Sequence, residues 1–256
     1  ISANKRGGSV RGKVYLVGAG PGDPELLTLK AVRVLEKADV VLYDRLISPE
    51  ILSLVNPFAE TVYVGKEPGE QERVQGEIFD LMLARARSER TVVRLKSGDP
   101  MVYGRGGEEW VFLADHGIEV EIVPGISSAL AVPGLAGIPL TLRGVANGFT
   151  VLSGQGKNGT MPDFKPYAHS DTLVILMGVK KRAEIACQLI AAGRPTSEPA
   201  AFIENGSTPK EHVVTATLGD VAEGKTQVSS PAVWVVGGVV KVRGQIHAED
   251  AAEIAA

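Results

Sequence analysis

Short apolar runs alternate with segments of helical periodicity through the first half of the chain. The runs, rich in β-branched residues, are Val14–Val17, Asp39–Tyr43, Thr61–Val64, Thr91–Leu95 and Glu119–Val123. Segments with apolar residues three or four positions apart, which predict helices, lie at Leu26–Ala38, around Ile51 and Leu54, at residues 70–90 and at Glu109–His116. Because strands that alternate with helices pair in parallel, this half is predicted to be an α/β domain with a mostly parallel sheet.

The second half has more closely spaced strand patterns and one strong helix pattern, Arg182–Ala192. The strand patterns are Phe149–Leu152, Leu173–Met177, Ala200–Ile203, Val213–Thr217 and Val233–Val236. Turn sequences at residues 205–207 and at Gly224 join the late strands, which indicates a mixed sheet with some antiparallel pairing.

A stretch rich in Gly and Pro, residues 133–148, lies between the two halves. Such a stretch interrupts regular structure, so we place the domain junction there. The chain is therefore predicted to contain two α/β domains, at residues 13–141 and 148–242, with flexible termini at residues 1–12 and 243–256.

The composition predicts a packed protein and argues against two classes of partner. Apolar residues make up 44% of the 256 residues and charged residues 22%, as is usual in globular proteins. The net charge of −3 argues against a nucleic-acid partner, since such proteins usually carry a basic excess. No apolar run is long enough to span a membrane, so we expect no membrane partner.

Cys187 is the single cysteine, so no intrachain disulfide can form and a reducing compartment is favoured. The helical pattern places Cys187 with Ile185 and Leu189, and we expect its side chain to be buried. The first residues include Lys5 and Arg6 with no apolar core behind them, so we expect no signal peptide and a cytoplasmic location.

Three glycine-rich loops follow predicted strands of the first half. They are Gly18–Pro24, Lys96–Glu109 and Pro124–Ser128. The first loop lacks the spacing of a dinucleotide fingerprint and the Gly-Lys-Ser/Thr of a phosphate-binding P-loop. One such loop alone can be explained as a tight turn, but three at the carboxyl edge of one parallel sheet predict a ligand site.

The first of these loops resembles a known family. The run Gly18–Ala31, GAGPGDPELLTLKA, is similar to the opening signature of the tetrapyrrole methylases. Tyr43–Leu46, Val64–Lys66 and Arg94–Glu109 resemble the branch that methylates uroporphyrinogen III. Further matching motifs extend the resemblance over roughly residues 13–241: Val123–Ile126, Gly137–Thr141, Met177–Gly178 and Ile203–Gly206.

The resemblance implies a fold, a reaction and partners. The fold would be two αβα domains, the first with a mostly parallel and the second with a mixed sheet, binding S-adenosyl-L-methionine in the cleft between them. The reaction would be two methyl transfers to uroporphyrinogen III, at carbons 2 and 7. They yield precorrin-1 and then precorrin-2, for sirohaem or cobalamin, and leave S-adenosyl-L-homocysteine. Members are typically homodimers without a metal.

The resemblance also implies roles for single residues. Asp44 matches the acid/base position and Lys66 a second proton-transfer position. The positions that match donor contacts are Pro21, Ser97, Gly98, Asp99, Val102, Ser127, Ser128, Met177 and Gly206. Two positions depart from the family pattern: Ser97 stands where a glycine is usual, and Glu67 where an arginine is frequent. Ser97 adds a hydroxymethyl group beside the donor, and Glu67 removes a contact to an acidic substrate.

The chemistry of methyl transfer agrees with these roles. A proton must leave the tetrapyrrole once a carbon has been methylated, and a carboxylate at a strand end such as Asp44 can accept it. The alternative for Asp44 is a helix cap or a structural strand end. Lys66 is either a proton donor or a solvated loop lysine.

The substrate is a polycarboxylate, and Arg is the better fork for carboxylates. Strand-end candidates are Arg45, Arg94, Arg105 and Arg143, with Arg105 preferred because it lies between two glycines; a surface ion pair is the alternative for each. Met177 is either core filler or, beside Gly178, a donor contact. The four histidines lie apart without ligand spacing, so we expect no metal site.

Three alternatives remain open. The same fold can methylate a later precorrin, although the run Lys96–Glu109 favours uroporphyrinogen III. A protein that binds donor or tetrapyrrole without turnover has only Ser97 and Glu67 in its favour. A ribosomal RNA methylase on this fold is disfavoured by the net charge of −3.

Overall fold

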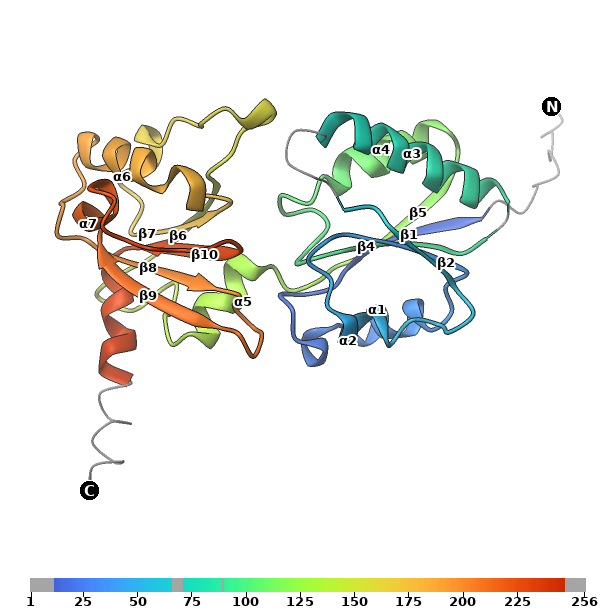
Figure 1. Cartoon of the computed structure of the whole chain (residues 1–256), viewed down its shortest axis with the longest axis horizontal. Helices are drawn as coiled ribbons and strands as arrows, with labels where there is room; N and C mark the ends of the chain where they lie inside the picture. The colour runs from blue at the N-terminus through green and yellow to red at the C-terminus, as the bar shows by residue number, and fades with distance from the viewer. Residues whose placement is uncertain (1–11, 66–70, 89, 247–256) are drawn as a thin grey trace, which may run out of the picture. The chain divides into compact units, whose positions relative to one another are not determined.

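A computed structural model describes residues 12–65, 71–88 and 90–246 (Figure 1). The chain divides into two compact units between Ser127 and Ser128. Both units are α/β, and together they confirm the predicted two-sheet architecture.

In the described part of the first unit, five strands form one sheet in the order β3-β2-β4-β1-β5. The strands are β1 Lys13–Gly18, β2 Val40–Tyr43, β3 Glu60–Tyr63, β4 Val92–Lys96 and β5 Glu119–Val123. Every pairing is parallel, so all five carboxyl ends lie at one edge. The connection after β1 runs toward β2 and the connection after β4 runs toward β5, on opposite sides. This makes the β1/β4 boundary a topological switch point, where open α/β sheets bind ligands.

Helices cover both faces of the first sheet (Figure 1). They are the 3-10 turn η1 Pro24–Leu26, α1 Leu29–Leu35, α2 Pro49–Leu52, α3 Gln71–Arg87 and α4 Gly106–Asp115. On one face, Leu35 of α1 and Ile51 of α2 pack with Val41 of β2. On the other, Met82 of α3 and Leu113 of α4 pack in one cluster with Leu16 and Leu42. Alternate side chains of each strand thus serve opposite core layers, as the period of a strand requires.

Five strands also form the sheet of the second unit as far as the structure describes it, in the order β6-β7-β10-β8-β9. They are β6 Phe149–Ser153, β7 Thr172–Leu176, β8 Pro199–Glu204, β9 His212–Thr217 and β10 Ala232–Val236. Strands β6 and β7 are parallel and the other pairs antiparallel, which confirms the predicted mixed sheet.

Helices lie on both faces of this second sheet as well (Figure 1). They are α5 Ser128–Leu135, α6 Arg182–Ala191, α7 Leu218–Ala222 and the 3-10 turns η2 Lys157–Gly159, η3 Lys165–Tyr167, η4 Val179–Lys181 and η5 Gly238–Val240. Leu189 of α6 and Val221 of α7 pack on the face that carries Trp234. Val132 of α5 packs on the opposite face with Val235.

The boundary between the units lies before the Gly/Pro-rich stretch in which the sequence placed it. Pro133 and Gly134 disfavour a helix, yet both lie within α5. Ala129 and Val132 of this helix, with Ile138 after it, belong to the core of the second unit. Burial of this apolar face outweighs the low helix propensity, so residues 128–146 belong with the second sheet.

The prediction that Cys187 is buried is wrong: its side chain is exposed. Ile185, Ala186 and Leu189 form the buried side of α6. At about 100° per residue, Cys187 lies roughly 200° from both Ile185 and Leu189, and therefore on the outer face.

The described ends of the chain are part of the fold. The Gly12 amide donates to the Ala86 carbonyl at 2.9 Å. Residues 241–246 are helical, and Arg243 donates to the Ala136 carbonyl. Residues 1–11 and 247–256, predicted to be flexible, lie outside the described residues. None of the helices in the described ranges combines the length and the apolar character needed to cross a bilayer.

Candidate active site

The three glycine-rich loops of the first unit meet at the carboxyl edge of its sheet. The loops after β1 and β4 exchange two hydrogen bonds, Gly98 N to Gly20 O at 2.7 Å and Gly20 N to Gly98 O at 3.2 Å. The loop after β5 joins them through Gly125 N, which donates to Asp99 Oδ2 at 3.1 Å. Asp99 Oδ1 accepts from Met101 N at 2.8 Å, so this carboxylate organises two loops at the switch point.

Backbone packing explains the glycines in these loops. A Cβ on Gly18 would lie 2.5 Å from Gly125 N and 2.6 Å from Gly98 O. Real Cβ atoms do not approach backbone this closely, and backbone cannot move aside as a flexible side chain can. Glycine at this position is therefore needed for the loops to touch.

Several non-glycine residues near the strand ends have positive φ. In the first unit they are Tyr103, with φ of 52°, and Arg105, with φ of 58°, both between β4 and α4. In the second unit Met177 has φ of 56° directly after β7, and its side chain is 50% exposed. Such conformations cost roughly 1–3 kcal/mol each and are concentrated at functional sites.

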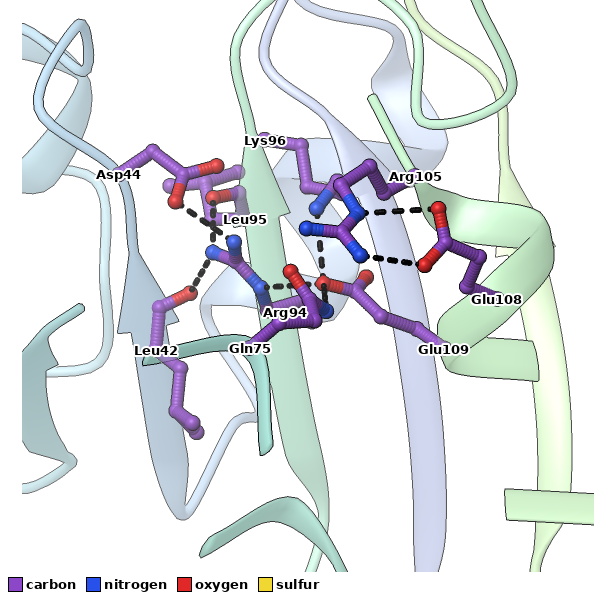
Figure 2. Close-up of polar contacts among 9 residues, drawn as sticks. All are labelled: Leu42, Asp44, Gln75, Arg94, Leu95, Lys96, Arg105, Glu108 and Glu109. Carbon is purple, nitrogen blue, oxygen red and sulfur yellow. Dashed lines mark hydrogen bonds and ion pairs between the residues drawn. The ribbon is translucent and has the colours of Figure 1, made fainter. Parts of the chain in front are cut away.

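A buried network of charges lies beneath the loops (Figure 2). The side chain of Arg94 on β4 is 1% exposed and that of Glu109 on α4 is fully buried. Arg94 Nε donates to Glu109 Oε1 at 3.2 Å, and Lys96 Nζ donates to the same oxygen at 2.9 Å. Gln75 Nε2 of α3 donates to it as well, at 3.2 Å. This cluster ties α3 and α4 to the central strand.

Asp44 is the carboxylate at the open end of this network. It follows β2 directly, and the register of β2 with β4 pairs Leu42 with Arg94. Arg94 Nη2 donates to Asp44 Oδ1 at 2.6 Å, and the Asp44 side chain is 29% exposed (Figure 2). Among the described residues, Asp44 Oδ2 has no hydrogen bond. One oxygen of Asp44 is therefore anchored and the other is available.

The network shifts the pKa of both its cations. Burial alone would lower the pKa of Arg94, but the carboxylates of Asp44 and Glu109 raise it above its ordinary value. For Lys96, burial and the neighbouring Arg94 hold the pKa below its ordinary value despite Glu109. Arg94 therefore stays charged, whereas the charged form of Lys96 is disfavoured.

The arginines predicted to bind substrate carboxylates differ in their surroundings. Arg94 is buried with its donors engaged inside the protein, so it does not serve as such a contact. Arg105 forms a two-point ion pair with Glu108, through Nε at 2.9 Å and Nη2 at 2.6 Å. Arg45, next to Asp44, and Arg143, in the second unit, are exposed.

The predicted site residues fall in both units. The first unit contains Asp44 and the donor-matching positions, all of which lie within the three glycine-rich loops: Pro21, Ser97, Gly98, Asp99, Val102 and Ser127. The second unit contains Ser128, Met177 and Gly206. Lys66 and Glu67 lie outside the described residues. A Cβ on Gly206 would lie 2.3 Å from Val132 Cγ1, so this glycine lets β8's loop pack on α5.

Sequence reasoning missed Glu109, Lys96 and Gln75 as parts of the site. A signal was present: the strand VVRLK has two cations two positions apart in an otherwise apolar run. Side chains two apart share a face of a strand, so both would need one buried anion. The sequence did not show which of the nearby glutamates supplies it.

Residues 13–222 match the family of Tetrapyrrole (Corrin/Porphyrin) Methylases. The chain belongs to this family. The motifs that carried the resemblance in the sequence, the loops after β1, β4 and β5, are the ones that meet at the switch point.

Relatives of this methylase include a plant and an archaeal protein. The chain is 47% identical over 251 residues to the S-adenosyl-L-methionine-dependent uroporphyrinogen III methyltransferase, chloroplastic, of Arabidopsis thaliana, covering 94% of this chain and 67% of the relative. It is 46% identical over 237 residues to the uroporphyrinogen-III C-methyltransferase of Methanocaldococcus jannaschii, covering 90% and 98%. The chain spans about half the length of the curated sirohaem synthases it matches, 52% in one case.

A solved structure shares the fold of the methylase. It is the uroporphyrin-III C-methyl transferase of Thermus thermophilus in complex with S-adenyl homocysteine. The two superpose with a TM-score of 0.82 at 54% sequence identity, over 90% of this chain and 94% of the other.

In the described ranges there is no group of three or more His, Cys, Asp or Glu side chains placed to hold a metal ion. Met177 is half-exposed at positive φ, which is unusual for a residue that normally fills cores. A side chain presented in this way is accessible to a ligand.

Proposed function

We propose that this tetrapyrrole methylase transfers methyl groups from S-adenosyl-L-methionine to carbons 2 and 7 of uroporphyrinogen III. The products are precorrin-1 and then precorrin-2, for sirohaem or cobalamin synthesis. The observation that carries the proposal is the carboxylate of Asp44, which lies at the same sheet edge as the switch-point loops. Its Oδ1 is bound by Arg94, and its Oδ2 has no hydrogen bond among the described residues. The activities named for the plant and archaeal relatives support the choice of substrate.

The donor is held by the strand-end loops. In the first unit we assign this role to Pro21, Ser97, Gly98, Asp99, Val102 and Ser127, and in the second to Ser128, Met177 and Gly206. When bound, the donor supplies an electrophilic methyl: the sulfur–methyl bond breaks with its electrons on sulfur, and a carbon–carbon bond forms to a pyrrole carbon. The backbone of the loops orients the reactants, which is the main requirement of such a displacement.

Asp44 removes the proton that the methylated tetrapyrrole must lose. The sulfonium's positive charge passes to the tetrapyrrole with the methyl group, and loss of one proton to Asp44 Oδ2 restores the original charge of the tetrapyrrole. A positioned base of this kind contributes about 10²–10⁴-fold to a rate. Lys66 takes part in a second proton transfer, and Arg45, Arg105 and Arg143 bind substrate carboxylates.

We also propose that the enzyme is a cytoplasmic homodimer. The single cysteine supports a reducing compartment, and the family resemblance supports the dimer. Sedimentation at several protein concentrations tests the dimer directly.

Methyl-labelled S-adenosyl-L-methionine tests the function. The protein is incubated with the labelled donor and uroporphyrinogen III without oxygen, and the tetrapyrrole is isolated and oxidised. Two labels per tetrapyrrole and the precorrin-2 chromophore are expected. An unlabelled tetrapyrrole, in a protein that binds the donor, contradicts the proposal. Label in a later precorrin that is supplied in place of uroporphyrinogen III, with none in uroporphyrinogen III itself, indicates the alternative substrate.

A further inference from the structure

Arg94 is held on all sides by groups of the first unit. Its guanidinium has five N–H donors, and it makes hydrogen bonds to four acceptors. Besides Asp44 and Glu109, these are the carbonyls of Leu42, at 3.4 Å, and Leu95, at 3.3 Å. Two carboxylates and two strand carbonyls thus fix the plane of the guanidinium (Figure 2).

Glu109, the second carboxylate partner of Arg94, is also fixed in place. Glu109 Oε1 accepts hydrogen bonds from Arg94, Lys96 and Gln75, which lie on two different elements. Glu109 itself is on α4, so three elements determine where Arg94 lies. Three donors on Oε1 of this fully buried carboxylate hold Glu109, and through it Arg94, in place.

Asp44 has no comparable support of its own. Within the described ranges the single hydrogen-bond partner of its side chain is Arg94, through Oδ1. Its side chain is partly exposed and follows the end of a strand, where an aspartate can rotate about two bonds. Arg94 is therefore what determines the direction in which Oδ2 points.

We propose that Arg94 is a positioning residue for methylation, which holds Asp44 Oδ1 so that Oδ2 faces the tetrapyrrole proton. Glu109 acts through Arg94 by fixing its other end. This inference rests on the proposed role of Asp44 as proton acceptor. It assigns a function to a buried arginine that makes no contact with substrate.

Arg94→Lys tests the proposal because it keeps the charge but removes the planar fork. Misplacement of a reacting group by about 1 Å can cost about 10²-fold, so we expect kcat to fall by about 10- to 100-fold. The KM for the tetrapyrrole and the affinity for the donor should stay within about twofold. A rise in KM with unchanged kcat overturns the proposal, since it indicates a substrate contact.

Arg194→Lys is the matched control. Arg194 is also a buried arginine, with hydrogen bonds to Glu198 at 2.5 Å and to the Ser170 carbonyl, but it lies in the second unit. We expect this change to affect stability as Arg94→Lys does, and to leave kcat unchanged. An equal loss of kcat in both variants indicates a general effect of buried arginines and overturns the proposal.

A double-mutant comparison separates positioning from a structural role. In an Asp44→Asn background, Arg94→Lys should cost less than about twofold, because there is no longer a base to position. If the fall in kcat of the double variant equals the product of the two single-variant falls, Arg94 acts independently of Asp44 and the proposal is contradicted.

Crystal structures of the variants supply a readout that does not depend on activity. In Arg94→Lys, the Asp44 side chain should lose its single orientation; an unchanged orientation overturns the proposal. The orientation of Asp44 can be read from the structure even if the protein does not methylate uroporphyrinogen III. Failure of the proposed function is therefore distinguished from failure of the positioning role. If Arg94→Lys does not fold, Glu109→Gln replaces it. A smaller fall in kcat is then expected, again with unchanged KM and with an Asp44 side chain that no longer has one orientation. Full turnover with an unmoved Asp44 in that variant contradicts the proposal.

Discussion

The backbone of Gly125 lies directly against that of Gly18: a Cβ on Gly125 would be 2.7 Å from the Gly18 Cα and 2.3 Å from the Gly98 oxygen. This contact joins the loops after β5, β1 and β4, which carry most of the donor-binding residues assigned in the first unit. The edge of the site is thus built from backbone packed against backbone, with the Asp99 carboxylate bound to the amides of Gly125 and Met101.

We predict that Gly125→Ala destabilises the protein by about 3 kcal/mol and abolishes measurable donor binding, since the added methyl meets backbone that cannot repack. Urea unfolding and calorimetric titration with S-adenosyl-L-methionine measure the two effects. Gly76→Ala is the control, because Gly76 lies in α3 with no atom within 4 Å of the added Cβ. It should raise stability by roughly 0.5–1 kcal/mol. Normal donor binding by Gly125→Ala would contradict the packing argument.

The strands and loops show how much of the fold the sequence predicts. Each predicted strand of both sheets is present, because short apolar runs rich in β-branched residues favour strands over helices. The glycine-rich turns after β1, β4 and β5 were predicted to share an edge, and the parallel order brings them there. Helix α5 was not predicted, because Pro133 and Gly134 conceal it and its packing on the second sheet is not visible in local sequence.

The site itself was only partly predictable. The sequence pointed to Asp44 and to the loops, and it offered Arg94 as a surface fork for substrate carboxylates. It could not show that Arg94 points into the protein toward Glu109, because the choice between two faces of a strand with helices on both sides depends on tertiary packing. The same applies to Cys187, for which a nearby apolar helix face was insufficient evidence of burial.

We predict that Glu109→Ala costs about 3 kcal/mol or more of unfolding free energy. The change leaves the buried Lys96 without its carboxylate partner and the buried Arg94 with Asp44 as its one remaining carboxylate. The control is Glu119→Ala, which removes a solvent-exposed partner of Lys13 at 2.7 Å and should cost about 1 kcal/mol or less. Equal stability of the two variants in urea unfolding would refute the cost assigned to the buried network.

A further prediction concerns alkaline pH. Burial and Arg94 lower the pKa of Lys96 from its ordinary 10.5. Between the lowered pKa and 10.5 the unfolded chain binds a proton that the folded protein does not, so through Lys96 the unfolding free energy rises with pH. Relative to wild type, Lys96→Met should lose this rise, as measured by urea unfolding from neutral pH up to 10.5.

Lys225→Met is the control for this pH dependence. Glu223 raises the pKa of Lys225, so its stabilising effect is complete below 10.5 and is lost only above that value. The rise of stability below 10.5 should therefore persist in Lys225→Met. Its persistence in Lys96→Met as well would show that Lys96 is not its source.

The most direct test of the role of Asp44 compares Asp44→Asn and Asp44→Ala with wild type in single-turnover methylation of uroporphyrinogen III at saturating donor. The affinity for the donor is measured on the same samples. The account predicts that both variants bind S-adenosyl-L-methionine as wild type does and transfer methyl groups about 10²–10⁴-fold more slowly. Undiminished methyl transfer by either variant would contradict it.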